Sequence, residues 1–93
     1  MKQTAQKFTK RVILTNEDGL HMRPATMIYE CAAKFQSEVE LEANGRVVGT
    51  HSVMELLLLA AIKGTVITVS AEGPDSEEAV NAVVDLICSE FPY

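Results

Sequence analysis

The sequence predicts an α+β fold, an open-faced β-sandwich in which a four-stranded antiparallel sheet carries three helices on one face. Four extended segments and three segments with helical spacing of apolar residues follow in the order β-α-β-β-α-β-α. Asn44-Gly45 joins two of the extended segments directly, which is the strongest short-range signal for an antiparallel hairpin. Polar outer faces on the strands and one-sided helices favour a sheet that is covered on one side only.

The first half of the chain contains three of these elements. Residues 8–15, FTKRVILT, are rich in β-branched and aromatic residues and predict a strand, which the turn sequence NEDG ends. A helix is predicted from Met22 to Phe35. Its apolar and small positions are Ala25, Ile28, Tyr29, Ala32 and Phe35. Residues 37–43, SEVELEA, alternate strictly, so the apolar residues face one side of a strand and the glutamates the other.

The second half begins with the hairpin partner, residues 46–50. Residues 51–61, HSVMELLLLAA, predict a short helix that ends near Lys63-Gly64, and residues 65–71, TVITVSA, predict the fourth strand. Residues 76–91 predict an amphipathic helix whose first turn contains two glutamates, which the helix dipole stabilises there. The apolar positions of this last helix are Val80, Val83, Val84, Ile87 and Phe91.

Length and composition indicate one domain over residues 1–93, with residues 1–7 as a flexible N-terminal extension. A net charge of −5 argues against a nucleic-acid partner, because no basic stripe is available to displace phosphate counterions. The longest apolar run, VMELLLLAAI, is about half the length that crosses a bilayer, and the N-terminus lacks the apolar core of a signal peptide. We therefore expect a cytoplasmic protein that is not inserted in a membrane. We also expect a monomer. Cys31 and Cys88 should then be reduced, small apolar residues of helices.

His21 stands between the NEDG turn and the start of the first predicted helix, followed by Arg23 and Pro24. A helix that begins near Met22 makes His21 its N-cap, and Pro24 is tolerated in the first turn because those backbone N–H groups lack intrahelical partners. The free N–H groups, the helix dipole and the charge of Arg23 favour a neutral imidazole and a bound anion. These residues predict a nucleophile that accepts a phosphoryl group.

Other interpretations of His21 stay open on these residues alone. A histidine at a helix start also caps the helix or fills a gap in the surface. A metal site is disfavoured because His51 is the only other histidine and no Cys-x-x-Cys is present, so we expect neither a metal nor a cofactor. A catalytic triad lacks support, since one histidine among many surface acids fits no particular arrangement.

The string GLHMRPA resembles the active-site signature G-L-H-x-R-P-A of HPr, the histidine-containing phosphocarrier family of the bacterial phosphoenolpyruvate-dependent phosphotransferase system. The resemblance runs from Phe8 to Phe91 and includes the order of elements, the Asn-Gly hairpin, and the strings HSVMELL and KGTVITVSAEG. It implies a phosphoryl carrier without turnover of its own, rather than an enzyme. The leucine-rich second helix, IKG and the ending SEF look closer to NPr, the nitrogen-related branch of the family, than to the sugar-uptake branch.

The resemblance also implies a role for each residue of the signature. His21 would carry the phosphoryl group on Nδ1, Arg23 would be the charge partner of that group, and Pro24 would fix the first turn. The donor would be phosphorylated enzyme I, and the acceptor a histidine of an enzyme IIA component. A runner-up from another class is a regulatory module that binds an amino acid at a dimer interface and has no need of His21. A third is a member that is phosphorylated but signals by docking.

Ser52 has two interpretations. Because Glu55 follows three residues later, the pair predicts a capping box at a helix start. The resemblance suggests instead a regulatory phosphoserine, since an HPr kinase/phosphorylase modifies the serine at this position in some members. A phosphoserine would gain from the helix dipole but would face the like charge of Glu55, where the regulated members carry a small residue. This departure favours the cap.

The second predicted helix has apolar residues on almost every side. A helix lying on a sheet buries only about half of its circumference, so some of these residues must face water. Exposed apolar patches on small proteins usually mark docking surfaces. We expect a docking patch around His21, formed by Met22, Val53, Met54 and Leu57. Leu56 and Leu59 should belong to the core.

Overall fold

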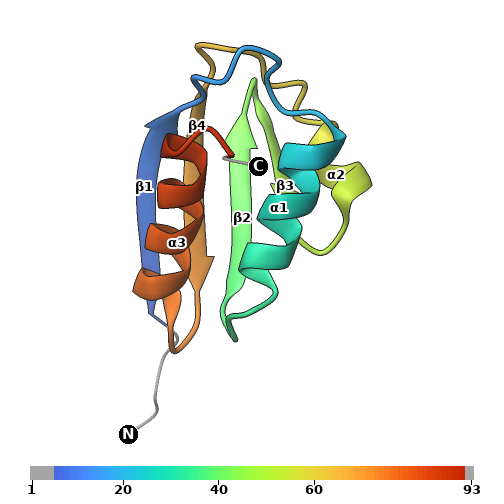
Figure 1. The fold of residues 1–93 in the computed structure, drawn as a ribbon. Coiled ribbons are helices and arrows are strands. Elements are labelled where there is room, and N and C mark those ends of the chain that lie inside the picture. Colours follow the sequence, from blue (N-terminus) through green and yellow to red (C-terminus); the bar gives the residue numbers. More distant parts are fainter. Residues whose placement is uncertain (1–5, 92–93) are drawn as a thin grey trace, which may run out of the picture.

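A four-stranded antiparallel sheet carries the helices on one face and leaves the other face open, as Figure 1 shows for the computed structural model. The structure describes residues 6–91. The strands lie in the order β1-β4-β2-β3, and the predicted fold class and order of elements are confirmed. The elements are β1 (Lys7–Ile13), α1 (Met22–Ala32), β2 (Glu38–Ala43), β3 (Arg46–Gly49), α2 (Val53–Leu57), β4 (Val66–Glu72) and α3 (Ser76–Cys88).

The hairpin between β2 and β3 has the predicted geometry. Asn44 and Gly45 both adopt positive φ, 54° and 76°, as a two-residue hairpin turn requires, and Ala43 pairs with Arg46 across it. The side-chain amide of Asn44 donates to the carbonyl of Leu59 at 2.9 Å. The hairpin tip is thereby attached to the segment that follows α2.

Strict alternation along β2 and β4 forms the floor of the core. Every second residue of these strands is buried beneath the helices, and the residues between them face the open side of the sheet. The helices close the core from above, with α3 lying along β1 and β4 and α1 packing against both other helices. The largest buried side chains are Leu14, Ile28, Leu41, Leu56, Leu59, Ile67 and Ile87. The prediction that Leu56 and Leu59 belong to the core is confirmed.

All three helices are shorter than predicted. The predicted second helix covers residues 51–61, but α2 ends at Leu57, and the N–H groups of Leu58 and Leu59 bond to carbonyls three residues back before Ala60 turns to φ 52°. The last helix ends at Cys88, and Phe91 reaches the core from a turn with φ 56°. The helical spacing of apolar residues continues past the end of each helix, because the turn that follows the helix also buries an apolar side chain.

The first helix departs from its predicted extent and face. It ends at Ala32, so Phe35 packs against the core from the turn beyond the helix. Tyr29, expected on the apolar face, is 39% exposed, because it lies on the flank of α1 next to α2 and lines an open hollow with Thr50 and His51. The buried face of α1 is narrower than the apolar spacing suggested and consists of Pro24, Ala25, Ile28 and Ala32.

The predicted N-terminal extension over residues 1–7 is too long. Lys7 is the first residue of β1, and the carbonyl of Gln6 accepts a hydrogen bond from the N–H of Gly73 at 2.8 Å. Residues 1–5 lie outside the described residues. Cys31 and Cys88 are free thiols on helices, as expected, although Cys88 is exposed. Within residues 6–91, the helices are too short to cross a lipid bilayer.

Candidate functional site

His21 is the N-cap of α1, as predicted, and it is exposed to solvent. Its backbone is extended (φ −120°, ψ −166°), and its carbonyl accepts the first helical hydrogen bond, from the N–H of Ala25 at 2.9 Å. Pro24 lies in the first turn, where its ring is fully buried and its fixed φ suits the helix. The imidazole is therefore held at the positive end of an 11-residue helix and is open to solvent.

The first turn of α1 is prepared for an anion. The N–H groups at the start of an α-helix lie ahead of its first i to i−4 bond, which here joins Ala25 to His21, and Pro24 has no N–H. The His21 side chain makes no capping hydrogen bond to these groups, and no acidic residue stands in this first turn. Arg23 is exposed and adds a full positive charge two residues from the imidazole. An anion on the ring would find amide donors, the helix dipole and a guanidinium nearby.

The loop that places His21 depends on Gly19. This glycine has φ +69°, and a Cβ on it would lie 2.7 Å from the carbonyl oxygen of Ala61. The next residue, Leu20, donates its N–H to that same oxygen at 2.9 Å. The backbone before His21 therefore lies directly against the loop that follows α2. Sequence reasoning did not identify this contact, although the glycine in GLHMRPA was its signal.

Further bonds fasten the two loops together. Leu14 donates its N–H to the Thr65 carbonyl at 2.9 Å and accepts from the N–H of Gly64 at 2.7 Å. The ammonium of Lys63 lies 2.7 Å from a carboxylate oxygen of Glu17. This bond lowers the pKa of Glu17 and raises the pKa of Lys63. Both side chains are solvent-exposed, so the backbone bonds rather than this ion pair fix the loops.

Ser52 is the N-cap of α2, and its hydroxyl accepts a hydrogen bond from the N–H of Glu55 at 3.4 Å. This is the first half of the predicted capping box, and it accounts for the serine structurally. The helix that it caps has five residues. Ser52 is half-buried.

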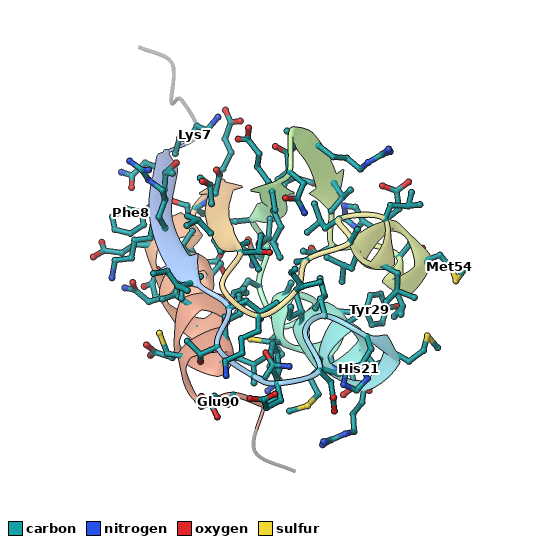
Figure 2. The ribbon with its side chains drawn as sticks, turned by 90° about the horizontal axis from the view of Figure 1, so that it is seen from above. Lys7, Phe8, His21, Tyr29, Met54 and Glu90 are labelled. Atoms are coloured by element: carbon teal, nitrogen blue, oxygen red, sulfur yellow. The ribbon has the colours of Figure 1, made fainter. Side chains whose placement is uncertain are left out.

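The predicted docking patch is only partly exposed. Met22 and Met54 are 59% and 69% exposed, whereas Val53 and Leu57 are half-buried and pack against the core. Seen from above in Figure 2, His21, Tyr29 and Met54 lie on the side of the molecule away from β1. Two further exposed apolar residues, Leu58 and Ile62, were missed by the sequence analysis. Ile62 lies beside Gly19 and so close to the His21 loop.

The second histidine lies elsewhere. Nε2 of His51, which lies between β3 and α2, is 2.8 Å from a carboxylate oxygen of Glu38 at the start of β2, and both side chains are exposed. In the described part of the chain, no three His, Cys, Asp or Glu side chains come together as metal ligands. Burial raises the pKa of the Cys31 thiol, which keeps it protonated and weakly nucleophilic. His21 is thus the described side chain best placed for chemistry.

The family model and the similar proteins found for this chain all belong to one family. A family model described as the PTS HPr component phosphorylation site matches residues 8–89. The phosphocarrier protein HPr of Vibrio cholerae is 40% identical over 80 residues, which are 86% of this chain and 94% of that protein. The crystal structure of HPr-C-His from Thermoanaerobacter tengcongensis has a TM-score of 0.85 at 39% identity, covering 90% of this chain and 94% of that chain. The phosphocarrier protein HPr from Bacillus anthracis has a TM-score of 0.80 at 34% identity, covering 85% and 94%.

Proposed function

This chain belongs to the HPr family of phosphocarrier proteins, and on that premise we propose that His21 accepts a phosphoryl group from enzyme I and donates it to a histidine of enzyme IIA. HPr proteins carry the group in the phosphotransferase system and are not stand-alone enzymes. The observation that supports His21 as the carrier is its exposed position at the N-cap of α1, at the positive end of the helix dipole. Because the protein would be a member of this relay, we expect it to be a monomer in the cytoplasm.

The proposed step exchanges one P–N bond for another. The lone pair of the neutral His21 Nδ1 attacks the phosphorus of the donor phosphohistidine, and the donor P–N bond breaks with its electron pair returning to the donor ring. The phosphoryl group brings about two negative charges to His21. The amides of Met22 and Arg23, the dipole of α1 and the guanidinium of Arg23 stabilise that charge without any proton transfer.

A carrier must also release the group. His21 is at the surface, and no acidic side chain in the first turn of α1 repels the incoming group. The site has few contacts that would trap the phosphoryl group, so the partner supplies the alignment for in-line transfer. A shallow site on a rigid helix end therefore suits repeated loading and release.

We propose that both partners dock on the docking patch named above, with Met22 and Met54 as the contacts that protrude most. Val53 and Leu57 support them from their half-buried positions, and Leu58 and Ile62 extend the apolar surface. Apolar side chains near a reactive group exclude water when a partner covers them, which strengthens the electrostatic interactions at His21. Ser52 acts as a helix cap in this proposal, and modification by an HPr kinase/phosphorylase is not required.

The test is phosphorylation in solution. Incubation with phosphoenolpyruvate, Mg²⁺ and enzyme I should add one acid-labile phosphoryl group, detected by intact-protein mass spectrometry. His21→Ala should take up none, whereas His51→Ala, which removes the only other histidine, should be loaded normally. Uptake by the His21→Ala protein would reject the assignment. Trials with enzyme I and enzyme IIA of the sugar-uptake and nitrogen-related branches would show which relay the chain serves.

A further inference from the structure

β1 is an edge strand whose outer side has no partner strand among the described residues. Leu14 donates its N–H to Thr65, and Gln6 accepts from Gly73, so the even-numbered residues direct their backbone groups toward β4. Backbone groups alternate sides along an antiparallel strand. The residues whose N–H and C=O groups therefore point outward are Lys7, Thr9, Arg11 and Ile13.

This edge is positively charged in a protein that is negative overall. The seven residues of β1, KFTKRVI, include Lys7, Lys10 and Arg11, all exposed, and no acidic residue. The net charge of the whole chain is −5, so this concentration of positive charge is local. Glu72 of β4 stands opposite Lys7, which leaves Lys10 and Arg11 as the centre of the positive charge. The ammonium of Lys10 is held 2.7 Å from Oδ1 of Asn81 on α3, beside the edge. A second copy of β1 would meet like charges here, whereas an acidic strand would meet opposite ones.

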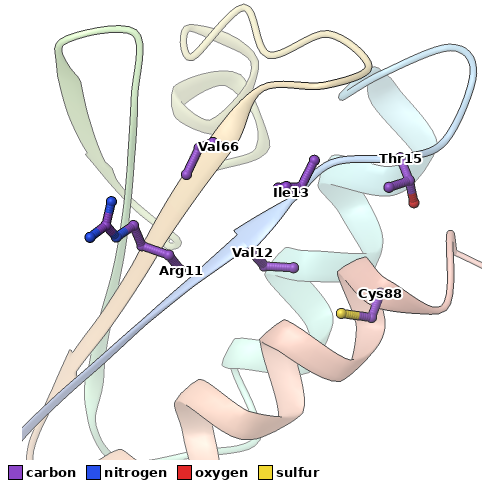
Figure 3. A pocket seen from close by; sticks show the side chains of 6 residues that line it. All are labelled: Arg11, Val12, Ile13, Thr15, Val66 and Cys88. Atoms are coloured by element: carbon purple, nitrogen blue, oxygen red, sulfur yellow. The ribbon is translucent and has the colours of Figure 1, made fainter.

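An open hollow of about 600 Å³ lies at the end of β1 (Figure 3). Ile13 and Val66, which are neighbours in the register of β1 and β4, form its apolar wall on the open face of the sheet. Figure 3 shows that Cys88, at the end of α3, and Thr15 approach it from the other side of the strand. Its volume lies within the roughly 300–1,000 Å³ of small-molecule ligand pockets, which leaves ample room for an apolar side chain.

We propose that the free edge of β1 binds an extended, acidic segment of a partner protein as a fifth strand, with an apolar side chain of that segment in the hollow. Strand addition combines backbone hydrogen bonds for affinity with side-chain pockets for specificity, and this edge offers both. Lysines on an edge discourage pairing with neutral or basic strands, which restricts the site to acidic partners. The edge lies away from His21 and Met54 in Figure 2, so binding there leaves the carrier site accessible.

The direct test uses a model strand. An acetylated and amidated peptide of alternating Glu and Val residues, ending in Leu, is titrated into ¹⁵N-labelled protein. We expect amide shifts and slowed hydrogen exchange at Lys7, Thr9, Arg11 and Ile13, and weaker binding as salt is added. The same peptide with Lys in place of Glu should not bind. Equal binding of both peptides, no binding of either, or shifts confined to other surfaces would overturn the proposal.

Two kinds of variant separate edge pairing from charge attraction. Thr9→Pro removes an outward N–H but no bond to β4, and the loss of one backbone hydrogen bond should weaken the acidic peptide about fivefold. Thr9→Val keeps the N–H and should bind normally. Arg11→Glu leaves the backbone unchanged and should also weaken binding. This variant still tests the proposal if Thr9→Pro is unstable. His21→Ala should bind the peptide like the parent protein, which makes this result independent of the carrier role.

Discussion

The Ser37 hydroxyl donates a hydrogen bond of 2.6 Å to the carboxylate of Asp75, 38 residues further along the chain. The same carboxylate accepts from the backbone N–H groups of Ser37 at 2.9 Å and Gln36 at 3.0 Å, and the N–H of Asp75 donates back to the Ser37 hydroxyl at 3.1 Å. These bonds tie the connection between α1 and β2 to the start of α3. They lower the pKa of Asp75, and the Ser37 hydroxyl is the largest cause.

We predict that Asp75→Asn lowers stability at neutral pH and that the difference from the parent protein disappears in acid. The folded pKa of Asp75 is below its unfolded value, so the carboxylate stabilises the fold above the unfolded pKa. That contribution is lost as the pH falls through the folded pKa. Thermal unfolding of both proteins at about pH 7 and at a series of values below about pH 4 measures it.

Ser37→Ala is the companion variant. It removes the main cause of the pKa shift while leaving the carboxylate in place, so the pH-dependent part of the stability should shrink. A difference in thermal stability between the parent protein and Asp75→Asn that stays constant from neutral to acid pH would contradict this account. It would mean that the charge of Asp75 contributes nothing to stability.

We predict that Gly19→Ala slows phosphorylation of His21. Two effects act at this glycine: its φ of +69° disfavours a side chain, and a Cβ would lie 2.7 Å from the Ala61 carbonyl oxygen. Gly45→Ala is the matched control, since Gly45 has a similar φ of +76° and no atom within 4 Å of the added Cβ. Both variants carry the strain of a side chain at positive φ. The difference between their loading rates therefore reports the contact between the two loops.

The measurement is the initial rate of loading by enzyme I, together with a thermal melt of each glycine variant. Gly19→Ala should lose more rate than Gly45→Ala, because relief of the clash displaces the backbone just before His21. If both variants are loaded equally fast, the loop after α2 does not position the histidine.

The sequence was sufficient where residue type dictates conformation. Alternation in residues 37–43, positive φ at Asn44-Gly45, and a proline in the first turn of α1 each leave few alternatives, and each prediction is confirmed. The ends of α2 and α3 could not be predicted, because Ala60 and Phe91 adopt positive φ that neither residue type favours. The Asn44 side chain bonds to the Leu59 carbonyl beside the first turn, and Phe91 is buried in the core at the second, so contacts with distant residues stabilise both turns.

The surface near His21 was harder to predict than its chemistry. On a five-residue helix, a small rotation decides which leucines face water, and the spacing alone assigned Leu57 rather than Leu58 to the surface. The bonds between Ser37 and Asp75 and the contact between Gly19 and Ala61 join distant segments, so no local pattern announces them. Long-range packing is therefore the part of the site that needed the structure.

We predict that Met54→Glu weakens docking of enzyme I without affecting the fold. Met54 is 69% exposed, so the change leaves no cavity, but it places a charge in the apolar docking patch. The half-saturating concentration of enzyme I should rise about tenfold, as expected for one central interface residue. Val47→Glu, at an exposed apolar residue of β3, is the control and should leave this concentration unchanged. An equal effect of both variants would point to net charge rather than to the patch.

We predict that Arg23→Ala slows loading of His21 and that Arg23→Lys restores part of the rate. The guanidinium supplies a charge next to the group that arrives on the imidazole, and lysine keeps the charge but loses the planar fork that matches phosphoryl oxygens. Rates at saturating enzyme I isolate this effect from docking, and added salt should reduce the gap between Arg23→Ala and the parent protein. Arg11→Ala removes the same charge from β1 and should load normally. Should Arg23→Ala be loaded as fast as the parent protein, the amides and dipole of α1 alone would stabilise the phosphoryl group.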